Sequence, residues 1–479
     1  MILLATAAMA AEVGGYLRIM TRPDLEGGDG RLGYWNLYGR LLNEGPYAAL
    51  ELRQQILEPK PGSTEPWTSV HAKIEGGTIQ NADSENGSLA YFRLSQLYAL
   101  AGNTALQNVT WRLGTLDSNF GDLGLYDMRP AQVLFDTVGV QGRYDAGPLQ
   151  WTVGAGDAGF NLRGADYNTV FSAGTTAKVN IAHHVELGVG GQAYYEPEVV
   201  GNRYAPHSTP GVSYEDYVRG NVVQNFIDDN PGQLSDFPSP EPSDATSWKL
   251  VGYLGFGDAG PLRWNGLYAN WSHLHPKSYV TESYDGEDVE IYVTNLTDER
   301  EQVTVGTEMQ LTLIPTRWDV ALAGLYGNNT DGDNDIVPSD DDRDFMSAVL
   351  RTEVYVNPNF HLLAESSIAE ENSHNGNTYR NHVDSLFENT GGTAADDGLE
   401  YGDSDTRTTW QGKFGFVLSP LGAGIYTRPS LRLLYGIQYS SQNSAYGNSF
   451  VETLNEYNDF GNVERHWHSV LALEAEAWF

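Results

Sequence analysis

The chain has 479 residues, and its 63 Asp and Glu residues outnumber its 28 Lys and Arg residues, which gives a formal net charge of -35. This acidity excludes nucleic acid as a partner, because binding to phosphates depends on clustered Lys and Arg. The lack of cysteine excludes disulfides, thiolate metal sites and cysteine nucleophiles.

The first eleven residues, MILLATAAMAA, form a continuously apolar stretch. Ala8 and Ala10 flank Met9 as small residues flank a secretory cleavage site, and the stretch is too short for a membrane helix. We expect residues 1–10 to be a signal peptide, truncated at its charged start, and residues 11–479 to form one mature domain. The alternative is a buried first strand.

Many short segments alternate apolar and polar residues with a period of two, which predicts β-strands. In YAALELRQQ, Ala48, Leu50 and Leu52 share one face and Glu51 lies on the other. SLRLLYGIQYS has the same alternation. Such strands suit a soluble sandwich, whose apolar face meets a second sheet, or a membrane barrel, whose apolar face meets lipid.

The segments between the expected strands differ greatly in length. Short Gly-Pro turns, DAGPLQW at 145–151 and DAGPLRW at 258–264, alternate with long polar segments at 201–246, 328–344 and 371–408. Short turns at one end and long acidic loops at the other are typical of outer-membrane barrels. A soluble sandwich has less reason for this asymmetry.

One acidic loop has the spacing of a calcium site. Asp331, Asp333 and Asp335 alternate as oxygen ligands do, but the Gly and the distal Glu of an EF-hand are not in place. A solvated acidic loop is the preferred interpretation.

No motif for catalysis is present. The pairs His273 with His275 and His466 with His468 each share a strand face, but neither has a third ligand nearby, so a polar wall is preferred to a zinc site. The chain contains no nucleophile elbow, zinc-protease motif or phosphate-binding loop. The sequence therefore predicts no enzyme, no metal site and no cofactor.

Four segments resemble maltoporins, the trimeric sugar-specific porins of the bacterial outer membrane. They are GRLLNEGPYAALEL (39–52), NVTWRLGTLDSNFGDLGLYDMRP (108–130), SPLGAGIYTRPSLRLLYGIQYS (419–440) and LEAEAWF (473–479). In order, they resemble the second strand, the strand and inward loop that narrow the channel, a late strand and the last strand.

The resemblance implies an all-β fold, a transmembrane antiparallel β-barrel of 18 strands that closes between the segment near Tyr16 and the C-terminal strand. It implies short periplasmic turns, long acidic extracellular loops and an inward-folded constriction loop. It also implies a homotrimer in outer-membrane lipid that lets maltodextrin-like oligosaccharides diffuse into the cell.

The resemblance implies a track of aromatic rings on which the apolar face of a sugar stacks. Tyr16, Tyr47, Tyr426 and Trp478 fall where maltoporins have track aromatics. Taken singly, each could instead belong to the aromatic girdle at the lipid interface.

The resemblance also implies a charged constriction, at which Arg40, Arg93, Asp122 and Asp127 would bind sugar hydroxyls. Arginine offers a planar fork of donors to neighbouring hydroxyls, and carboxylates accept from them. Arg129 stands where the maltoporins have a constriction tyrosine, and we count it among the binding residues.

Several maltoporin features are missing. The constriction carboxylate on the second strand is replaced by Ala49, no tryptophan for a neighbouring subunit's track lies near 78–90, and the first-loop disulfide is absent. Maltodextrin specificity is therefore open, and the ligand could be another oligosaccharide, including an anionic one.

Alternation divides the two aromatic residues at the C-terminus. Phe479 shares the apolar face of Leu473, whereas Trp478 shares the face of Glu474 and Glu476, which should line the lumen. Two other functions remain open: a general or cation-preferring porin, and a secreted β protein such as an adhesin.

Overall fold

The computed structural model describes residues 11–22, 32, 36–58, 64–76, 92–158, 169–182, 184–197, 245–274, 279–284, 287–292, 300–331, 342–374, 406–441 and 466–479. The signal peptide expected over residues 1–10 lies outside this part of the chain. Almost all of the acidic loop with the spacing of a calcium site, and His275 of one histidine pair, also lie outside it.

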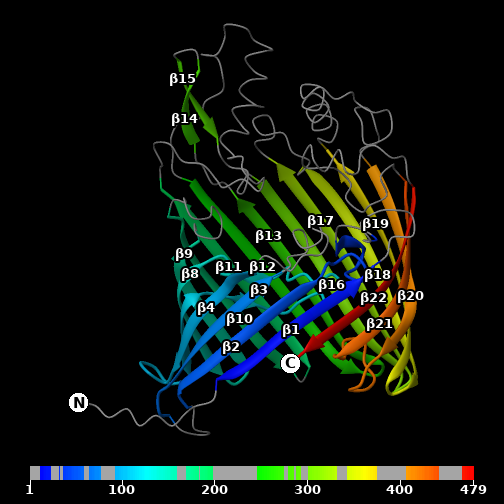
Figure 1. Ribbon diagram of the computed structural model, residues 1–479. Helices are drawn as coiled ribbons and strands as arrows, with labels where there is room; N and C mark the ends of the chain where they lie inside the picture. The colour runs from blue at the N-terminus through cyan, green and yellow to red at the C-terminus, as the bar shows by residue number, and fades with distance from the viewer. Residues whose placement is uncertain are drawn as a thin grey trace.

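Eighteen antiparallel strands form one closed barrel (Figure 1), which confirms the predicted fold. Each strand pairs with its neighbours in chain order, and β1 closes the ring by pairing with both β2 and β22. The barrel strands are β1 (Glu12–Thr21), β2 (Tyr47–Leu57), β3 (Trp67–Gly76), β4 (Phe92–Gly102), β5 (Val109–Thr115), β8 (Val138–Ala146), β9 (Leu149–Asp157), β10 (Phe171–Ala182), β11 (Val185–Glu196), β12 (Ala245–Ala259), β13 (Leu262–Leu274), β16 (Arg300–Ile314), β17 (Trp318–Asp331), β18 (Arg343–Asn357), β19 (Phe360–Ser373), β20 (Thr406–Leu418), β21 (Ser430–Ser440) and β22 (Trp467–Trp478).

A few short elements lie outside the barrel wall. They are the 3-10 turn η1 (Asn36–Tyr38), the paired strands β6 (Ser118–Asn119) and β7 (Gln132–Val133), and the hairpin of β14 (Tyr279–Tyr284) and β15 (Glu287–Tyr292). No helix among the described residues is long and apolar enough to cross a membrane.

The two faces of the wall have opposite chemistry. On β22, Leu471 and Leu473 are exposed on the outside, whereas Glu474 and Glu476 are buried on the inside. The same alternation runs along β21 and β18. An apolar exterior on a ring with no open edge meets the requirement for crossing a bilayer, because every wall strand is paired. The chain is a multi-pass barrel of the outer membrane.

The connections also differ between the two ends of the barrel. At the end where the C-terminus lies, the chain turns within two or three residues at 147–148, 260–261 and 315–317, and we call this the short-turn end. At the opposite, long-loop end, β11 and β12 are 48 residues apart in the chain, at 197–244. The asymmetry predicted from the sequence is present.

The C-terminal residue helps to close the ring. The Phe479 N–H donates to the Gly15 carbonyl at 3.1 Å, and the Gly15 N–H donates to the Phe479 carbonyl at 2.9 Å. A Cβ at Gly15 would come within 2.5 Å of the Phe479 ring, so glycine is required there. Phe479 therefore packs on the outside of β1, on the face predicted by alternation.

Three segments fold into the barrel. The constriction loop (residues 116–137) was predicted, whereas the η1 segment (residues 36–46) and the inward turn (residues 419–429) were not. All three contribute to one apolar cluster with the inner wall of β12, β13 and β17–β19. The segments around Arg40 and Tyr426 are therefore not strands, because β2 begins at Tyr47 and β21 at Ser430.

Candidate functional site: the narrowed lumen

Three aromatic rings form a row on the inner wall. The ring centroids of Trp478 and Tyr16 are 6.4 Å apart, and those of Tyr16 and Tyr47 are 5.7 Å apart. Alternation on three adjacent strands produces the row. Tyr16 on β1 pairs with Trp478 on β22, and Arg18, the next residue of β1 on the same face, pairs with Tyr47 on β2. Three of the four predicted track aromatics are thus brought together, and Trp478 lies on the lumen face as expected.

Charged groups hold the hydroxyls of this row. Tyr16 donates to Glu476 Oε1 at 2.6 Å, and Arg40 Nη2 donates to the Tyr16 hydroxyl and to Glu476 Oε1, each at 3.0 Å. Tyr47 donates to Glu75 Oε2 at 2.6 Å. Arg40 therefore lies beside the row and reaches it from the η1 segment; its predicted role in binding sugar hydroxyls stays a prediction.

Glu476 is the centre of a buried ion network. Arg40 pairs with it at 3.0 Å, and Arg428 and Arg432 pair with it as well. A carboxylate surrounded by three guanidinium groups keeps its charge, because each donor compensates for the lost hydration. This network fixes the position of the Tyr16 hydroxyl.

The constriction loop is anchored by its apolar side. Leu123, Leu125 and Tyr126 are buried against the wall, and the Leu125 N–H donates to Glu308 Oε2 at 2.8 Å. At the other end of the loop, the Leu134 N–H donates to Gln192 at 2.7 Å. The loop is therefore a packed layer on the wall.

The opposite side of the loop is polar. Asp122, Asp127 and Arg129 are exposed there, in the turn formed by the bridge between Leu123 and Met128. Asp127 interacts with Arg40, whereas Asp122 interacts with Tyr268 on the opposite wall. The loop thus brings Asp127 to the aromatic row and places Asp122 away from it, with Arg129 exposed on the same loop.

The η1 segment and the constriction loop meet at a pair of carboxyl groups, Glu44 and Asp127. Burial raises the pKa of Glu44 to about 7, against the effect of Arg18 and Arg40. A protonated Glu44 donates a hydrogen bond to Asp127. Asp127 is exposed to the lumen, but the protein around it removes part of its hydration, which acts to raise its pKa. Arg40, this hydrogen bond and Arg18 outweigh that effect and lower the pKa of Asp127. A second contact joins the segments, because the Arg40 N–H donates to the Leu125 carbonyl at 2.8 Å.

Tyr426 has a different position from the other predicted track residues. Its hydroxyl donates to Glu308 Oε1 at 2.6 Å, and its ring lies against Gly124 of the constriction loop. Glu308 also accepts from the Leu125 N–H of the constriction loop, so Tyr426 supports that loop through a shared carboxylate. Among the ring pairs of the described residues, none includes Tyr426.

Arg93 lies on β4, and its backbone pairs with that of Glu75 on β3. Only the backbone of Arg93 belongs to the described part of the structure, and its side chain does not. Because Tyr47 donates to Glu75, this pairing places the backbone of Arg93 near the Tyr47 end of the aromatic row.

The η1 segment is tied to the inner wall at β19 and β20 by buried charges. Tyr38 donates to Glu371, and Arg407 Nη2 donates to the Tyr38 hydroxyl at 2.9 Å and pairs with Glu371 at 3.3 Å. Lys413 Nζ donates to the Tyr38 carbonyl at 2.9 Å and pairs with Glu365 at 2.9 Å. Breaking such a pair on one side costs about 3–5 kcal/mol, so the segment is firmly fixed.

Sequence reasoning did not count among the site residues the carboxylates that orient the site, namely Glu75, Glu308 and Glu476, although it expected Glu476 on the lumen face. Each lies on the inward face of a strand whose other face is apolar. A carboxylate in that position was a usable signal, because it must line the lumen. What could not be read from the sequence is which ring or loop each one would meet.

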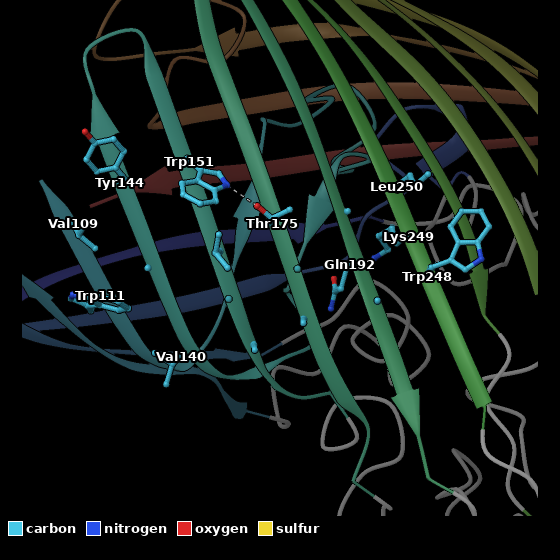
Figure 2. Close-up of a pocket in the computed structure, with 18 of the residues that line it drawn as sticks. Val109, Trp111, Val140, Tyr144, Trp151, Thr175, Gln192, Trp248, Lys249 and Leu250 are labelled. Carbon is cyan, nitrogen blue, oxygen red and sulfur yellow. Dashed lines mark hydrogen bonds between the residues drawn. The ribbon is translucent and has the colours of Figure 1, made fainter. Parts of the chain in front are cut away.

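A hollow of about 920 Å³ lies on the outer face of β5 and β8–β12. Figure 2 shows Trp151 in this hollow, where its Nε1 donates to Thr175 Oγ1 at 2.9 Å. Trp111, Tyr144 and Trp248 line it as well. Because it faces lipid, this hollow is separate from the lumen site.

No group of three or more potential metal-ligating side chains occurs within the described ranges. His466 and His468 are described, and His466 Nδ1 lies 2.8 Å from the Ser440 carbonyl oxygen. The expected polar role of this pair stays a prediction.

A closed barrel with an apolar exterior and an inward loop that narrows a polar lumen is the architecture of an outer-membrane porin. No protein-family model and no curated protein matches the chain. Among solved structures, it is similar to in-vitro folded OmpT, an outer membrane protein of Vibrio cholerae, with 8% identity, a TM-score of 0.37, and 98% of this chain and 97% of that chain covered. It is also similar to OpdL of Pseudomonas aeruginosa, with 9% identity, a TM-score of 0.43, and 98% of each chain covered. For OprD of the same organism, the identity is 8%, the TM-score 0.40, and the shares covered 98% and 95%.

Proposed function

We propose that the protein is an outer-membrane channel for facilitated diffusion of oligosaccharides of the maltodextrin type. The observation that carries the proposal is the row of Trp478, Tyr16 and Tyr47 beside the constriction. Rings at this spacing offer a sugar several equivalent stacking positions, so that it moves along the wall without one deep trap. Passage through such a channel needs no catalytic group and no cofactor.

The groups around the row support recognition of hydroxyls. Arg40 and Asp127 lie at the narrowed part of the lumen, where donors and acceptors are both within reach of the rings. A sugar has hydroxyls that donate and accept, and both kinds of partner serve it. The four segments that resemble maltoporins add an independent reason for this ligand class.

The proposal is tested by ion conductance through the purified protein in a planar bilayer. Maltohexaose is expected to block the current reversibly, and Trp478→Ala to weaken the block about fivefold, since a stacked ring contributes about 1 kcal/mol. Trp467→Ala is the matched control, because Trp467 lies on the same strand and faces lipid. A wild-type current that maltodextrins never reduce would contradict the proposal.

A second candidate function is a general, cation-preferring channel. The exposed Asp122 and Asp127 on the constriction loop favour it, since carboxylates at a constriction attract cations. The same bilayer experiment separates the two candidates: a cation-selective current without sugar block favours the general channel.

We also propose that the protein assembles as a homotrimer in outer-membrane lipid. Apolar residues cover the outside of the barrel, and part of that surface would then face neighbouring subunits. The mass of the complex extracted in lipid nanodiscs tests this: a mass of one chain would contradict it.

A further inference from the structure

The inner wall of β1–β4 carries a polar patch that is separate from the aromatic row. A cavity of about 370 Å³ lies on it, and its charged and aromatic lining consists of Glu12, Glu51, Arg53, His71, Lys73 and Tyr98. The strand register arranges these residues in two rows across four strands. In one row, Glu12 pairs with Arg53, Arg53 with His71, and His71 with Tyr98.

Planar groups are stacked along the first row. The ring centroids of His71 and Tyr98 are 4.7 Å apart with the planes 8° from parallel, and the Arg112 guanidinium lies 3.6 Å from the Tyr98 centroid. Gly114 pairs with Tyr98 and has no side chain, so Arg112 can cover the ring. The stack makes the patch a preformed surface, which lowers the entropy cost of binding.

Two guanidinium donors in this patch lack acceptors. Arg53 Nε and Arg112 Nη2 are buried without a hydrogen-bond partner among the described residues. A buried polar group without a partner costs free energy and calls for one. The outer part of Arg53 reaches the lumen, since 42% of its side chain is exposed.

The charges of the patch cancel. In the cavity lining, Arg53 and Lys73 are balanced by Glu12 and Glu51. Arg112 at the edge of the patch is balanced by Glu75, which pairs with Lys73 at 2.8 Å. A site with no net charge does not select an ion, whereas its alternating donors and acceptors fit a ligand whose groups both donate and accept. Sugar hydroxyls have this property.

The patch lies towards the short-turn end from the aromatic row. Arg53 follows Tyr47 on β2 by six residues, which corresponds to about 20 Å of extended strand. A ligand that leaves the row in that direction next meets the patch. We propose that this patch is a second sugar-binding station, which holds the hydroxyls of a neutral oligosaccharide whose other end is still stacked on Trp478, Tyr16 and Tyr47.

The inference rests on the proposed function and predicts an effect that depends on ligand length. An oligosaccharide long enough to span both places binds the row and the patch together, and the second contact acts at high effective concentration. A disaccharide occupies one place at a time. Loss of the patch should therefore weaken the block by long sugars more than the block by short ones.

The experiment measures block of single-channel current by maltose, maltohexaose and an oligogalacturonate, for the wild type, Arg53→Gln and Glu51→Gln. We expect each variant to weaken the maltohexaose block by about threefold to tenfold and to leave the maltose block unchanged. Lys178→Gln is the matched control, because Lys178 faces the lumen on β10 and pairs with Glu186 away from the patch.

Three outcomes would overturn the inference, and they are distinguishable. A maltohexaose block that is the same in both variants and the wild type rejects the second station and leaves the proposed function standing. If Arg53→Gln weakens the block by oligogalacturonate and by no other sugar, the patch is an anion site. A wild-type current that no sugar reduces rejects the proposed function together with the station.

Discussion

At the scale of single residues, Glu308 accepts hydrogen bonds from two of the segments that fold into the barrel. It accepts from Tyr426 of the inward turn and from the Leu125 N–H of the constriction loop. A carboxylate that accepts from both segments couples their positions, since movement of one changes the hydrogen bond of the other. Tyr426 therefore acts on the lumen through the loop that it supports.

Removing the Tyr426 hydroxyl tests this coupling. Tyr426→Phe should weaken the anchoring of the constriction loop by about 1–2 kcal/mol, since it leaves a buried carboxylate with one donor fewer. The expected result is a noisier open-channel current with little change in barrel stability. Tyr326→Phe is the control, because Tyr326 is exposed on the outer face. Unchanged noise together with a weaker sugar block would instead make Tyr426 a track residue.

The carboxyl pair of Glu44 and Asp127 predicts a dependence on pH. Burial raises the pKa of Glu44 from 4.5 to about 7, so its hydrogen bond to Asp127 is fully present below the ordinary pKa and is lost as the pH rises through about 7. Above that pH both carboxyls are charged. The cation preference of the current, measured by reversal potential, should increase between about pH 5 and about pH 8.

The control for this titration is Glu44→Gln, which keeps a donor towards Asp127 and cannot ionise. Arg18 and Arg40 also face the pair, and both stay charged over the whole range, so they do not produce the change. A pH dependence that persists in Glu44→Gln would assign the titration to another group.

The predicted residues show what a sequence can and cannot supply at this scale. Alternation alone placed Trp478 in the lumen, because strand parity is local and a closed barrel has only two faces. The positions of Arg40 and Tyr426 depend on segments that leave the wall and pack on distant strands. Their partners, Glu476 and Glu308, are far away in the chain, and no local pattern encodes that distance.

At the scale of elements, the seam between β1 and β22 is the last pairing that the chain can complete. It needs both ends of the sequence, and its geometry depends on Gly15. A Cβ there would come within 2.5 Å of both the Ala49 carbonyl oxygen and the Phe479 ring. The terminal aromatic is thus accommodated by a residue without a side chain on the neighbouring strand.

Gly15→Ala should therefore weaken closure of the barrel. The expected result is unfolding at a lower temperature, measured as the temperature at which the folded form is lost from a denaturing gel, because the ring or the strand must shift. Gly252→Ala is the matched control, since the nearest atom to its Cβ would be the Ala269 Cβ at 4.0 Å. Equal unfolding temperatures for the two variants would show that the seam tolerates the shift.

The wall strands could be predicted and the inward segments could not. A strand in this barrel meets lipid on one side and the lumen on the other, so its alternation is strong. The η1 segment buries Leu37, Tyr38, Leu41 and Leu42 with neither strand nor helix periodicity. Its apolar residues match the inner wall of β17–β22, and that match exists only after the barrel has formed.

At the scale of the whole molecule, the structure has a wall and an inner layer with different kinds of stabilisation. The wall is held by backbone pairing that runs through all 18 strands. The inner layer is held by apolar contacts and by hydrogen bonds to buried ion pairs on β19 and β20, Glu371 with Arg407 and Glu365 with Lys413. Because the two kinds are separate, the inner layer can be loosened while the wall remains closed.

The pair of Glu371 and Arg407 offers the decisive test of that separation. Glu371→Gln leaves Arg407 buried without its counter-charge, and breaking a buried pair on one side costs about 3–5 kcal/mol. The η1 segment should then detach from the wall, because the ion pair that holds both partners of the Tyr38 hydroxyl in position is broken. We expect a larger single-channel conductance and an unfolding temperature close to that of the wild type.

The double variant Glu371→Gln/Arg407→Met should restore much of the contact between the η1 segment and the wall, since it removes both charges and leaves groups that pack in the same space. Its conductance should return towards the wild-type value. If the single variant instead fails to form a barrel, the ion pair belongs to the stability of the wall, and wall and inner layer fold as one unit. If both variants conduct like the wild type, apolar packing of Leu37 and its neighbours is sufficient to hold the η1 segment.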